Sequence, residues 1–178
     1  MKYVALLRGI NVGGQNIVKM AALRSCLEQQ GFTNVTTFIQ SGNVVFECNE
    51  RHAPKLTRQI ETALSRAFGY DSRIVLRSQA QLKRVLADVP KEWKRRKDLR
   101  CNIVFLREPV TASEALREIK LAPGIDSAKT GRGVLYLSTL LSGVKKSRFT
   151  RVIGTPIYRQ MTIRNYNSCR KIFALMER

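Results

Sequence analysis

The chain has 178 residues, and its 32 lysines and arginines against 13 acidic residues give a formal net charge of +19. At 44% apolar residues it is too hydrophobic for intrinsic disorder, and a chain of this length can bury enough surface to fold as one domain or two small ones. No apolar run approaches the ~18 residues of a membrane span, and the opening MKYVALLR meets Arg8 too early for a signal-peptide core. We therefore expect a soluble, cytoplasmic protein with no membrane partner.

The first half of the chain shows the element order βαββαβ. The expected elements are a strand at 2–7, a helix from Met20 to about Gly31, strands at 35–40 and 43–48, a helix over Leu56–Phe68 and a strand at 72–77. Apolar residues in the second helix repeat every four positions and form one face: Leu56, Ile60, Leu64 and Phe68. Ser41-Gly42 separates the second and third strands, which predicts a tight hairpin. The first strand does not alternate, which indicates that both of its faces are covered.

The second half repeats this order after a possible capping box at Ser78 and Gln81, a short helix to about Leu86 and a polar connector at 90–100. The expected elements are a strand at 101–107, a helix at 111–121, strands near 125–130 and 133–139 around a Gly131-Arg132 turn, a helix at 142–153, a strand at 158–163 and a final helix from Asn165. We predict an α+β protein of two tandem ferredoxin-like (βαββαβ) halves, at 1–89 and 90–178, with antiparallel sheets and an extra C-terminal helix.

This topology places two polar segments together. The first and second strands of such a unit run parallel, and the hairpin follows the second strand. The loop after the first strand and the hairpin turn then lie at the same edge of the sheet. Residues 8–16 and 40–43 should therefore meet in space.

The loop RGINVGGQN at 8–16 is the first candidate site. Gly9 and Gly14 have the spacing of phosphate-loop glycines, but Gln15-Asn16 replace the Lys-Ser/Thr pair that would contact phosphate and magnesium. Two interpretations remain. Backbone N–H groups at a helix N-terminus, flanked by Arg8 and Lys19, could hold an anion, or the glycines simply turn the chain.

Four segments together resemble the bacterial DUF1697 family, which is catalogued as a domain of unknown function. They are RGINVGG at 8–14, the Lys19-Met20 pair, QSGNVVF at 40–46 and RNYNS at 164–168. The resemblance implies a tandem ferredoxin-like fold and no established activity. Tyr166 and Ser168 stand where the family usually has Trp and Thr, and both exchanges keep the chemistry of the position.

The residues of these segments give one candidate ligand-binding set: Arg8, Asn11, Gly13, Gly14, Lys19, Gln40, Ser41, Asn43, Arg164 and Asn165, with Asn167 beside them. The set holds cations, amides and a hydroxyl, but no His, Cys, Asp or Glu for acid-base catalysis or metal binding. Such side chains suit recognition of a phosphate or carboxylate. The alternative is purely local, since hairpins and helix caps also require Ser, Asn and Gly.

Other reactive residue types give no site. The cysteines are scattered without zinc or dithiol spacing, and we expect reduced, mostly buried thiols at Cys26, Cys48, Cys101 and Cys169. His52 is the only histidine and is expected in a solvated loop. We therefore expect no metal and no cofactor, and we favour a protein that is not an enzyme.

The positive charge lies mainly in the second half. Residues 1–89 hold 12 basic and 6 acidic side chains, whereas residues 90–178 hold 20 and 7, and no acid lies between Asp126 and Glu177. Such a field attracts nucleic-acid phosphates, although it could also serve solubility alone. The candidate nucleic-acid-binding residues are Lys94, Arg95, Arg96, Lys97, Lys145, Lys146, Arg148 and Arg151.

The leading hypothesis is non-enzymatic binding of nucleic acid or another polyanion through the basic C-terminal half. The alternative is a small anionic ligand, a nucleotide or phosphorylated metabolite, at the 8–16 loop and the 40–43 hairpin. A third possibility is an interaction module that pairs through sheet edges or apolar helix faces.

Overall fold

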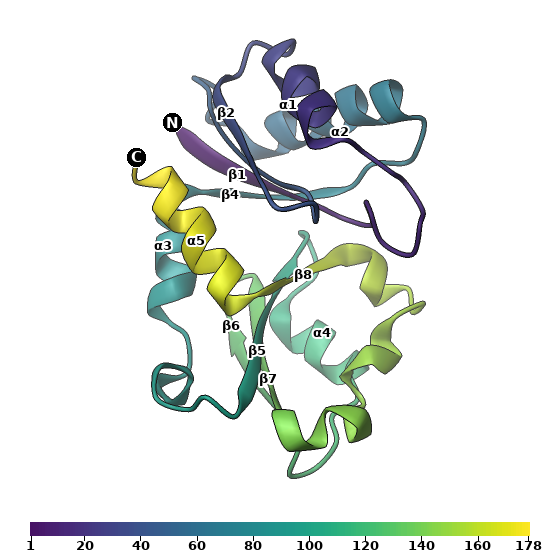
Figure 1. The fold of residues 1–178 in the computed structure, drawn as a ribbon, viewed down its shortest axis with the longest axis vertical. Coiled ribbons are helices and arrows are strands. Elements are labelled where there is room, and N and C mark those ends of the chain that lie inside the picture. The colour runs from purple at the N-terminus through teal and green to yellow at the C-terminus, as the bar shows by residue number, and fades with distance from the viewer. The chain divides into compact units, whose positions relative to one another are not determined.

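The fold was determined as a computed structural model that describes residues 1–178. It is a mixed α+β fold with two four-stranded antiparallel sheets (Figure 1). The chain divides into two compact units, residues 1–82 with 171–178 and residues 83–170. The independence of 1–89 and 90–178 as domains stays a prediction.

The first unit contains the element order expected for the first half. Its elements are β1 (Lys2–Leu7), α1 (Met20–Glu28), β2 (Thr33–Phe38), β3 (Asn43–Glu47), α2 (Ala53–Phe68) and β4 (Ile74–Ser78). The sheet order is β2-β3-β1-β4, and every neighbouring pair is antiparallel. Five consecutive residues of β1, Tyr3 to Leu7, are buried, as its lack of alternation predicts.

Both helices of this unit pack on one face of its sheet (Figure 1). The four-residue repeat in α2 places Leu56, Ile60 and Leu64 in the core, each fully buried. They belong to one apolar cluster with Leu23 of α1 and Phe46 of β3. The predicted core face of α2 is therefore confirmed.

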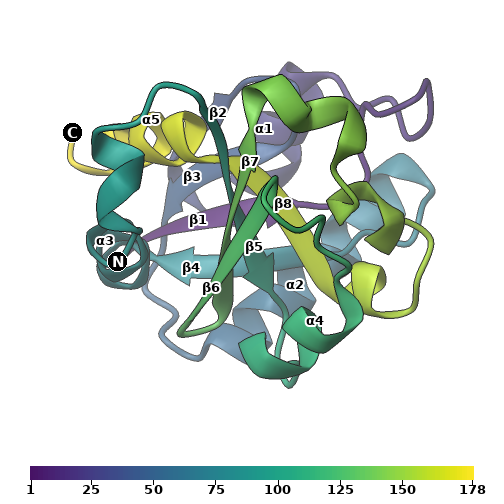
Figure 2. The ribbon, with the colours of Figure 1, turned by 90° about the horizontal axis from the view of Figure 1, so that it is seen from below.

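The second unit has a sheet with the equivalent order, β6-β7-β5-β8, again antiparallel throughout. Its elements are β5 (Leu99–Leu106), α4 (Ala112–Glu118), β6 (Asp126–Gly131), β7 (Val134–Leu140) and β8 (Met161–Asn165). All five are labelled in Figure 2. Thr111 begins α4 with a complete capping box, because its hydroxyl accepts from the Glu114 N–H at 3.2 Å while the Glu114 carboxylate accepts from the Thr111 N–H at 2.8 Å.

Two helices span the division between the units, namely α3 (Gln79–Ala87) and α5 (Tyr166–Met176). The capping pair expected at the start of α3 is present. The Ser78 N–H donates to Gln81 Oε1 at 2.8 Å, and Ser78 Oγ accepts from the Gln81 N–H at 3.3 Å. No helix in the structure combines the length and apolar character that crossing a bilayer requires.

The helix expected at 142–153 is wrong. Two short 3-10 helices, Leu141–Lys146 and Phe149–Val152, occupy this stretch, and a third, Ile157–Gln160, follows it. The buried Asp126 carboxylate accepts from the Ser147 hydroxyl and the Arg148 N–H, so these groups do not continue a helix. Lys145, Lys146, Arg148 and Arg151 also repel one another, and no acid in this stretch forms stabilising pairs with them.

Both predicted hairpin turns are also misplaced. The connection between β2 and β3 has four residues, 39–42, rather than the two residues Ser41-Gly42. Ile39 in this turn has a φ of +50°, a left-handed conformation that β-branched residues rarely adopt. The turn between β6 and β7 is Arg132-Gly133, one residue later than expected, because Gly133 supplies the positive φ.

Candidate functional site

The loop after β1 and the turn between β2 and β3 meet, as the topology predicts. The Leu7 N–H donates to the Gly42 carbonyl at 2.8 Å, and Asn11 Nδ2 donates to the Gln40 carbonyl at 2.8 Å. The approach at Gly42 is close, since a Cβ built there would lie 2.6 Å from Ile10 Cδ1. The two segments therefore form one continuous structure at this edge of the first sheet.

Residues 11–16 form a small hairpin of their own. The Asn11 N–H donates to the Asn16 carbonyl at 3.2 Å and the Gln15 N–H to the Val12 carbonyl at 3.1 Å. Gly13 and Gly14 at the tip have φ values of +60° and +76°, the positive pair that a type I′ turn needs. The loop does not lead directly into a helix N-terminus, because α1 begins only at Met20. The glycines turn the chain and do not lie at the N-terminus of α1, and anion binding by the loop stays a prediction.

The Asn side-chain amides of this region form hydrogen bonds within it. Asn11 Nδ2 donates to the Val18 carbonyl at 3.0 Å, and Asn11 Oδ1 accepts from the Val18 N–H at 2.8 Å. Asn43 is fully buried and donates to the Phe38 carbonyl and the Ser41 hydroxyl, both at 3.0 Å. These two predicted ligand-binding side chains thus hold the loop and the turn in shape. Binding by the set as a whole stays a prediction.

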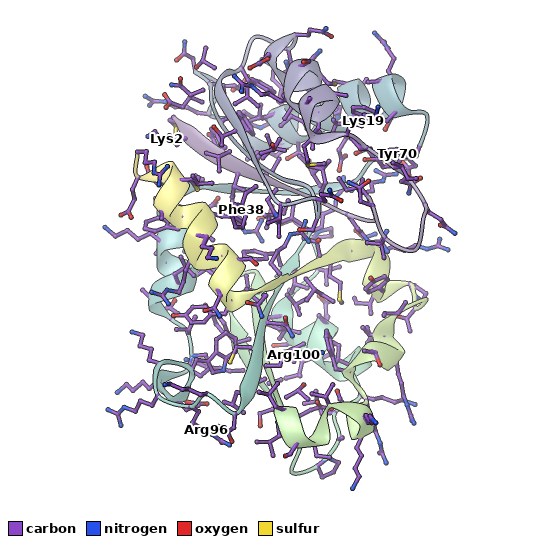
Figure 3. The ribbon with its side chains drawn as sticks, viewed as in Figure 1. Lys2, Lys19, Phe38, Tyr70, Arg96 and Arg100 are labelled. Atoms are coloured by element: carbon purple, nitrogen blue, oxygen red, sulfur yellow. The ribbon has the colours of Figure 1, made fainter.

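The remaining members of that set differ in exposure. Lys19 and Gln40 are exposed, while Arg8 is half-buried with its N–H donating to the Arg73 carbonyl at 3.0 Å. Figure 3 labels Lys19, which precedes α1.

Arg164 and Asn165 belong to the second unit, whereas the loop belongs to the first. Burial lowers the pKa of Arg164 to about 10, and its guanidinium donates to the Thr162 hydroxyl at 2.7 Å and the Ile163 carbonyl at 2.9 Å. Asn165 Oδ1 accepts from the Asn167 N–H at 2.9 Å, at the start of α5. The two sets of residues therefore lie in different units.

The two predicted basic clusters lie at the same end of the second sheet. Leu99, the first residue of β5, pairs with Leu140, the last residue of β7. Just beyond this pair, the Leu141 N–H donates to the Asp98 carbonyl at 2.9 Å. The segment before β5 and the segment after β7 are thus fastened side by side. Figure 3 labels Arg96 and Arg100 on the chain leading into β5 and on β5 itself.

We define the basic end as the eight exposed cations of these two segments: Lys94, Arg95, Arg96, Lys97, Lys145, Lys146, Arg148 and Arg151. Two acids, Glu92 and Asp98, lie in the same segments. Arg96 Nε donates to Asp98 Oδ1 at 3.0 Å, and this bond lowers the pKa of Asp98. One cation is therefore largely neutralised, and the basic end keeps a strong excess of positive charge.

Asp126 fixes the segment that carries the second cluster. Its carboxylate is 8% exposed and accepts from the Ala122 N–H at 2.9 Å, Thr139 Oγ1 at 2.8 Å, Ser147 Oγ at 2.7 Å and the Arg148 N–H at 3.0 Å. Burial acts to raise the pKa of Asp126, but these four hydrogen bonds together lower it. The last acid before Glu177 is thus an internal anchor for the cationic segment.

Trp93 anchors the other segment. Trp93 precedes the 94–97 cations in the sequence but is only 6% exposed. Its ring packs edge-on against Tyr136 and Tyr166, at centroid distances of 5.8 and 5.4 Å. The indole is therefore held in the core and is not available to stack on a base.

The titratable and nucleophilic groups give no second site. His52 is exposed and lies just before α2, as expected, and as the N-cap of that helix its Nδ1 accepts from the Lys55 N–H at 3.3 Å. Burial raises the pKa of the Cys101 thiol to about 11 and that of the Cys169 thiol to about 12. No three His, Cys, Asp or Glu side chains gather where they could hold a metal ion.

A groove between α1 and α2 was not predicted from the sequence. It has a volume of about 760 Å³ and is lined by residues of the last turn of α1 and of one face of α2. Its only sequence signal is the spacing of Arg58, Thr62 and Arg66, which places these side chains on one helix face.

The fold and these surfaces define a two-sheet α+β protein with one strongly basic end. The family described as "Protein of unknown function (DUF1697)" matches residues 1–136, and the chain belongs to this family.

Among solved structures, the chain is similar to the conserved bacterial protein SP0830 from Streptococcus pneumoniae. The two are 27% identical, the match covers 98% of each chain, and the TM-score is 0.83. No curated protein matches the chain.

Proposed function

We propose that this protein binds nucleic acid without catalysis, through phosphate contacts at the basic end of its second unit. The observation that carries the proposal is the hydrogen bond between the Leu141 N–H and the Asp98 carbonyl, which joins the two cationic segments at one end of the sheet. Cations held on a fixed framework attract a polyanion more strongly than the same charges on separate, mobile segments.

The residues at the basic end favour the phosphate backbone over the bases. The cluster consists of Lys and Arg side chains, and its neighbouring aromatic residue, Trp93, is buried. Phosphate contacts carry little sequence information, whereas base stacking needs an exposed ring. We therefore expect weak discrimination among sequences and a dissociation constant of roughly 1–100 µM at physiological salt.

The small-anion alternative at the 8–16 loop has less support. Asn11 and Asn43 already use their amide groups to hold the loop and the turn. The cations there are Arg8 and Lys19, far fewer than at the basic end.

The test is a fluorescence anisotropy titration with a labelled 20-base-pair duplex of mixed sequence. The triple variant Lys145→Ala, Lys146→Ala, Arg148→Ala should weaken binding by about 100-fold at low salt, because three phosphate contacts are lost. The control triple variant Arg51→Ala, Lys83→Ala, Arg84→Ala removes the same charge from exposed positions outside the basic end. Equal losses in the two variants, or no binding by the natural protein at low salt, would refute the proposal.

We also propose that both halves are variants of the ferredoxin-like fold. The strand orders β2-β3-β1-β4 and β6-β7-β5-β8 support this assignment, because the hairpin strand lies between the first two strands in both. The second half departs from the pattern, since 3-10 helices replace the helix between its third and fourth strands.

A further inference from the structure

The groove between α1 and α2 has the volume of a small-molecule site. The two helices lie side by side on one face of the first sheet (Figure 1), and the groove of about 760 Å³ runs between them. This volume falls within the ~300–1,000 Å³ range of typical ligand pockets. The basic end lies in the other unit and contributes no residue to it.

The lining combines small apolar side chains with amides. Cys26, which is 7% exposed, lies on the α1 side, and Ala63 and Ala67 lie on the α2 side. Gln59 Nε2 donates to the carbonyl of Gln30, just beyond the end of α1, at 3.4 Å and so links α2 to this segment across the groove. Small residues leave the space between the helices open, and their carbon atoms provide an apolar surface for a ligand.

The charge of the lining is entirely positive. No Asp or Glu is among the lining residues. Lys55 is paired with Glu50 at 2.7 Å, but no carboxylate lies within ion-pair distance of Arg58 or Arg66. These two arginines stand eight residues apart on one helix, which separates their α-carbons by roughly 12 Å along the axis.

We propose that this groove binds a small amphiphilic anion, a molecule with a phosphate or carboxylate group and an apolar body. A guanidinium matches either anion with two parallel hydrogen bonds, and Arg58 or Arg66 supplies one near each end of the groove. The apolar body would lie along Cys26, Ala63 and Ala67. A nucleic acid is a poorer match, because no aromatic side chain lines the groove and its polar contacts extend over a short distance.

The experiment is isothermal titration calorimetry of the full chain with decyl phosphate and decanoate, both below their micelle concentrations, and with inorganic phosphate. At least one amphiphile should bind with one-to-one stoichiometry and a dissociation constant below about 1 mM, and inorganic phosphate at least about tenfold more weakly. Arg58→Gln and Arg66→Gln should together weaken binding about tenfold or more, because each removes a charged hydrogen-bond donor.

Two further variants separate the groove from general charge effects. Ala67→Trp fills the groove from an exposed position and should abolish binding, whereas Arg51→Gln lies outside the lining and should leave it unchanged. The inference is overturned if neither amphiphile binds below about 1 mM, if Arg51→Gln has the same effect as the groove variants, or if Ala67→Trp has none. The groove and the basic end share no residue, so duplex DNA should not displace an amphiphile from the groove. Displacement by DNA would also overturn the groove proposal, whether or not DNA binds at the basic end.

Discussion

Replacement of Asp126 tests how the cationic segment is held in place. This carboxylate accepts four hydrogen bonds from three parts of the second unit: the loop before β6, the end of β7 and the segment 147–148. Asp126→Ala removes all four acceptors at once and leaves every cation of the basic end in the sequence. The variant therefore separates the arrangement of the charges from their number.

The expected loss of stability in Asp126→Ala depends on how many of the four hydrogen-bond donors can find another acceptor. The Thr139 and Ser147 hydroxyls can rotate toward other acceptors, but the Ala122 and Arg148 N–H groups cannot. A buried donor without an acceptor costs about 1–3 kcal/mol, which applies in full to the buried Ala122 N–H and in part to the part-buried Arg148 N–H, so we expect about 3 kcal/mol. Asp126→Asn keeps the shape and one carbonyl acceptor, and should cost about 1–2 kcal/mol.

The assays are urea denaturation and DNA binding. Because the fold lowers the pKa of Asp126, its ionised carboxylate stabilises the protein above about pH 4 and loses that contribution as the pH falls through the lower, folded-state pKa. The stability difference between the natural protein and Asp126→Asn should therefore shrink in acid. DNA affinity should fall in the folded Asp126→Asn variant although no cation has been removed.

The control is Asp71→Ala, which removes an exposed carboxylate paired only with Arg73 at 3.1 Å. It should leave the free energy of unfolding almost unchanged. A loss below about 1 kcal/mol for Asp126→Ala, or an equal loss for Asp71→Ala, would refute the anchoring role.

Three further predictions concern the loop, the turn and the thiols. Gly42→Ala should destabilise the protein by about 2–4 kcal/mol in urea, since it adds a steric clash to a positive φ, whereas Gly14→Ala, with open space around its Cβ, should cost only about 1 kcal/mol; equal costs would contradict the close approach. Asn11→Gly keeps the positive φ but removes three hydrogen bonds, so it should lower the free energy of unfolding by about 1–3 kcal/mol. It should also speed hydrogen exchange of the amide at residue 18, and unchanged exchange would contradict the role of Asn11 in holding the loop. With a thiol reagent at pH 8, half-buried Cys48 should react before Cys169, which should react only on unfolding; an equal rate at both would contradict their burial.

Most helices and strands could be predicted from the sequence, because the local residue patterns favour the same structure as the packing of the folded protein. The repeat of Leu56, Ile60 and Leu64 predicts a core face, and the structure buries these side chains. Thr111 with Glu114 predicts a helix start, and both hydrogen bonds of the capping box are present. The meeting of the 8–16 loop with the 40–43 turn followed from topology alone.

The structure differs from the sequence pattern where the local conformation depends on a residue far away in the chain. Residues 142–153 have apolar residues spaced for a helix, but Asp126 binds the backbone at Arg148 from another part of the chain. Trp93 sits among cations in the sequence, yet Tyr136 and Tyr166 bury its ring. The sequence around Arg148 does not identify Asp126 as its hydrogen-bond acceptor, and the sequence around Trp93 does not identify the two tyrosines that cover it.

The candidate site was only partly predictable for the same reason. The eight cations could be chosen from the sequence, but not the strand register that joins their two segments. The amides of the loop looked like ligand-binding groups because a side chain that holds a turn and one that holds a ligand use the same chemistry. The groove between α1 and α2 depends on the packing of two helices and left little signal in either.

The most direct test of nucleic-acid binding at the basic end is the salt dependence of DNA affinity. If about six of its cations contact phosphates of a duplex, the plot of log association constant against log salt concentration has a slope of about −5. The triple variant Lys145→Ala, Lys146→Ala, Arg148→Ala should reduce the magnitude of this slope by about 3, and the control triple variant should leave it unchanged. A slope near zero for the natural protein, or the same slope for natural protein and triple variant, would contradict the proposal.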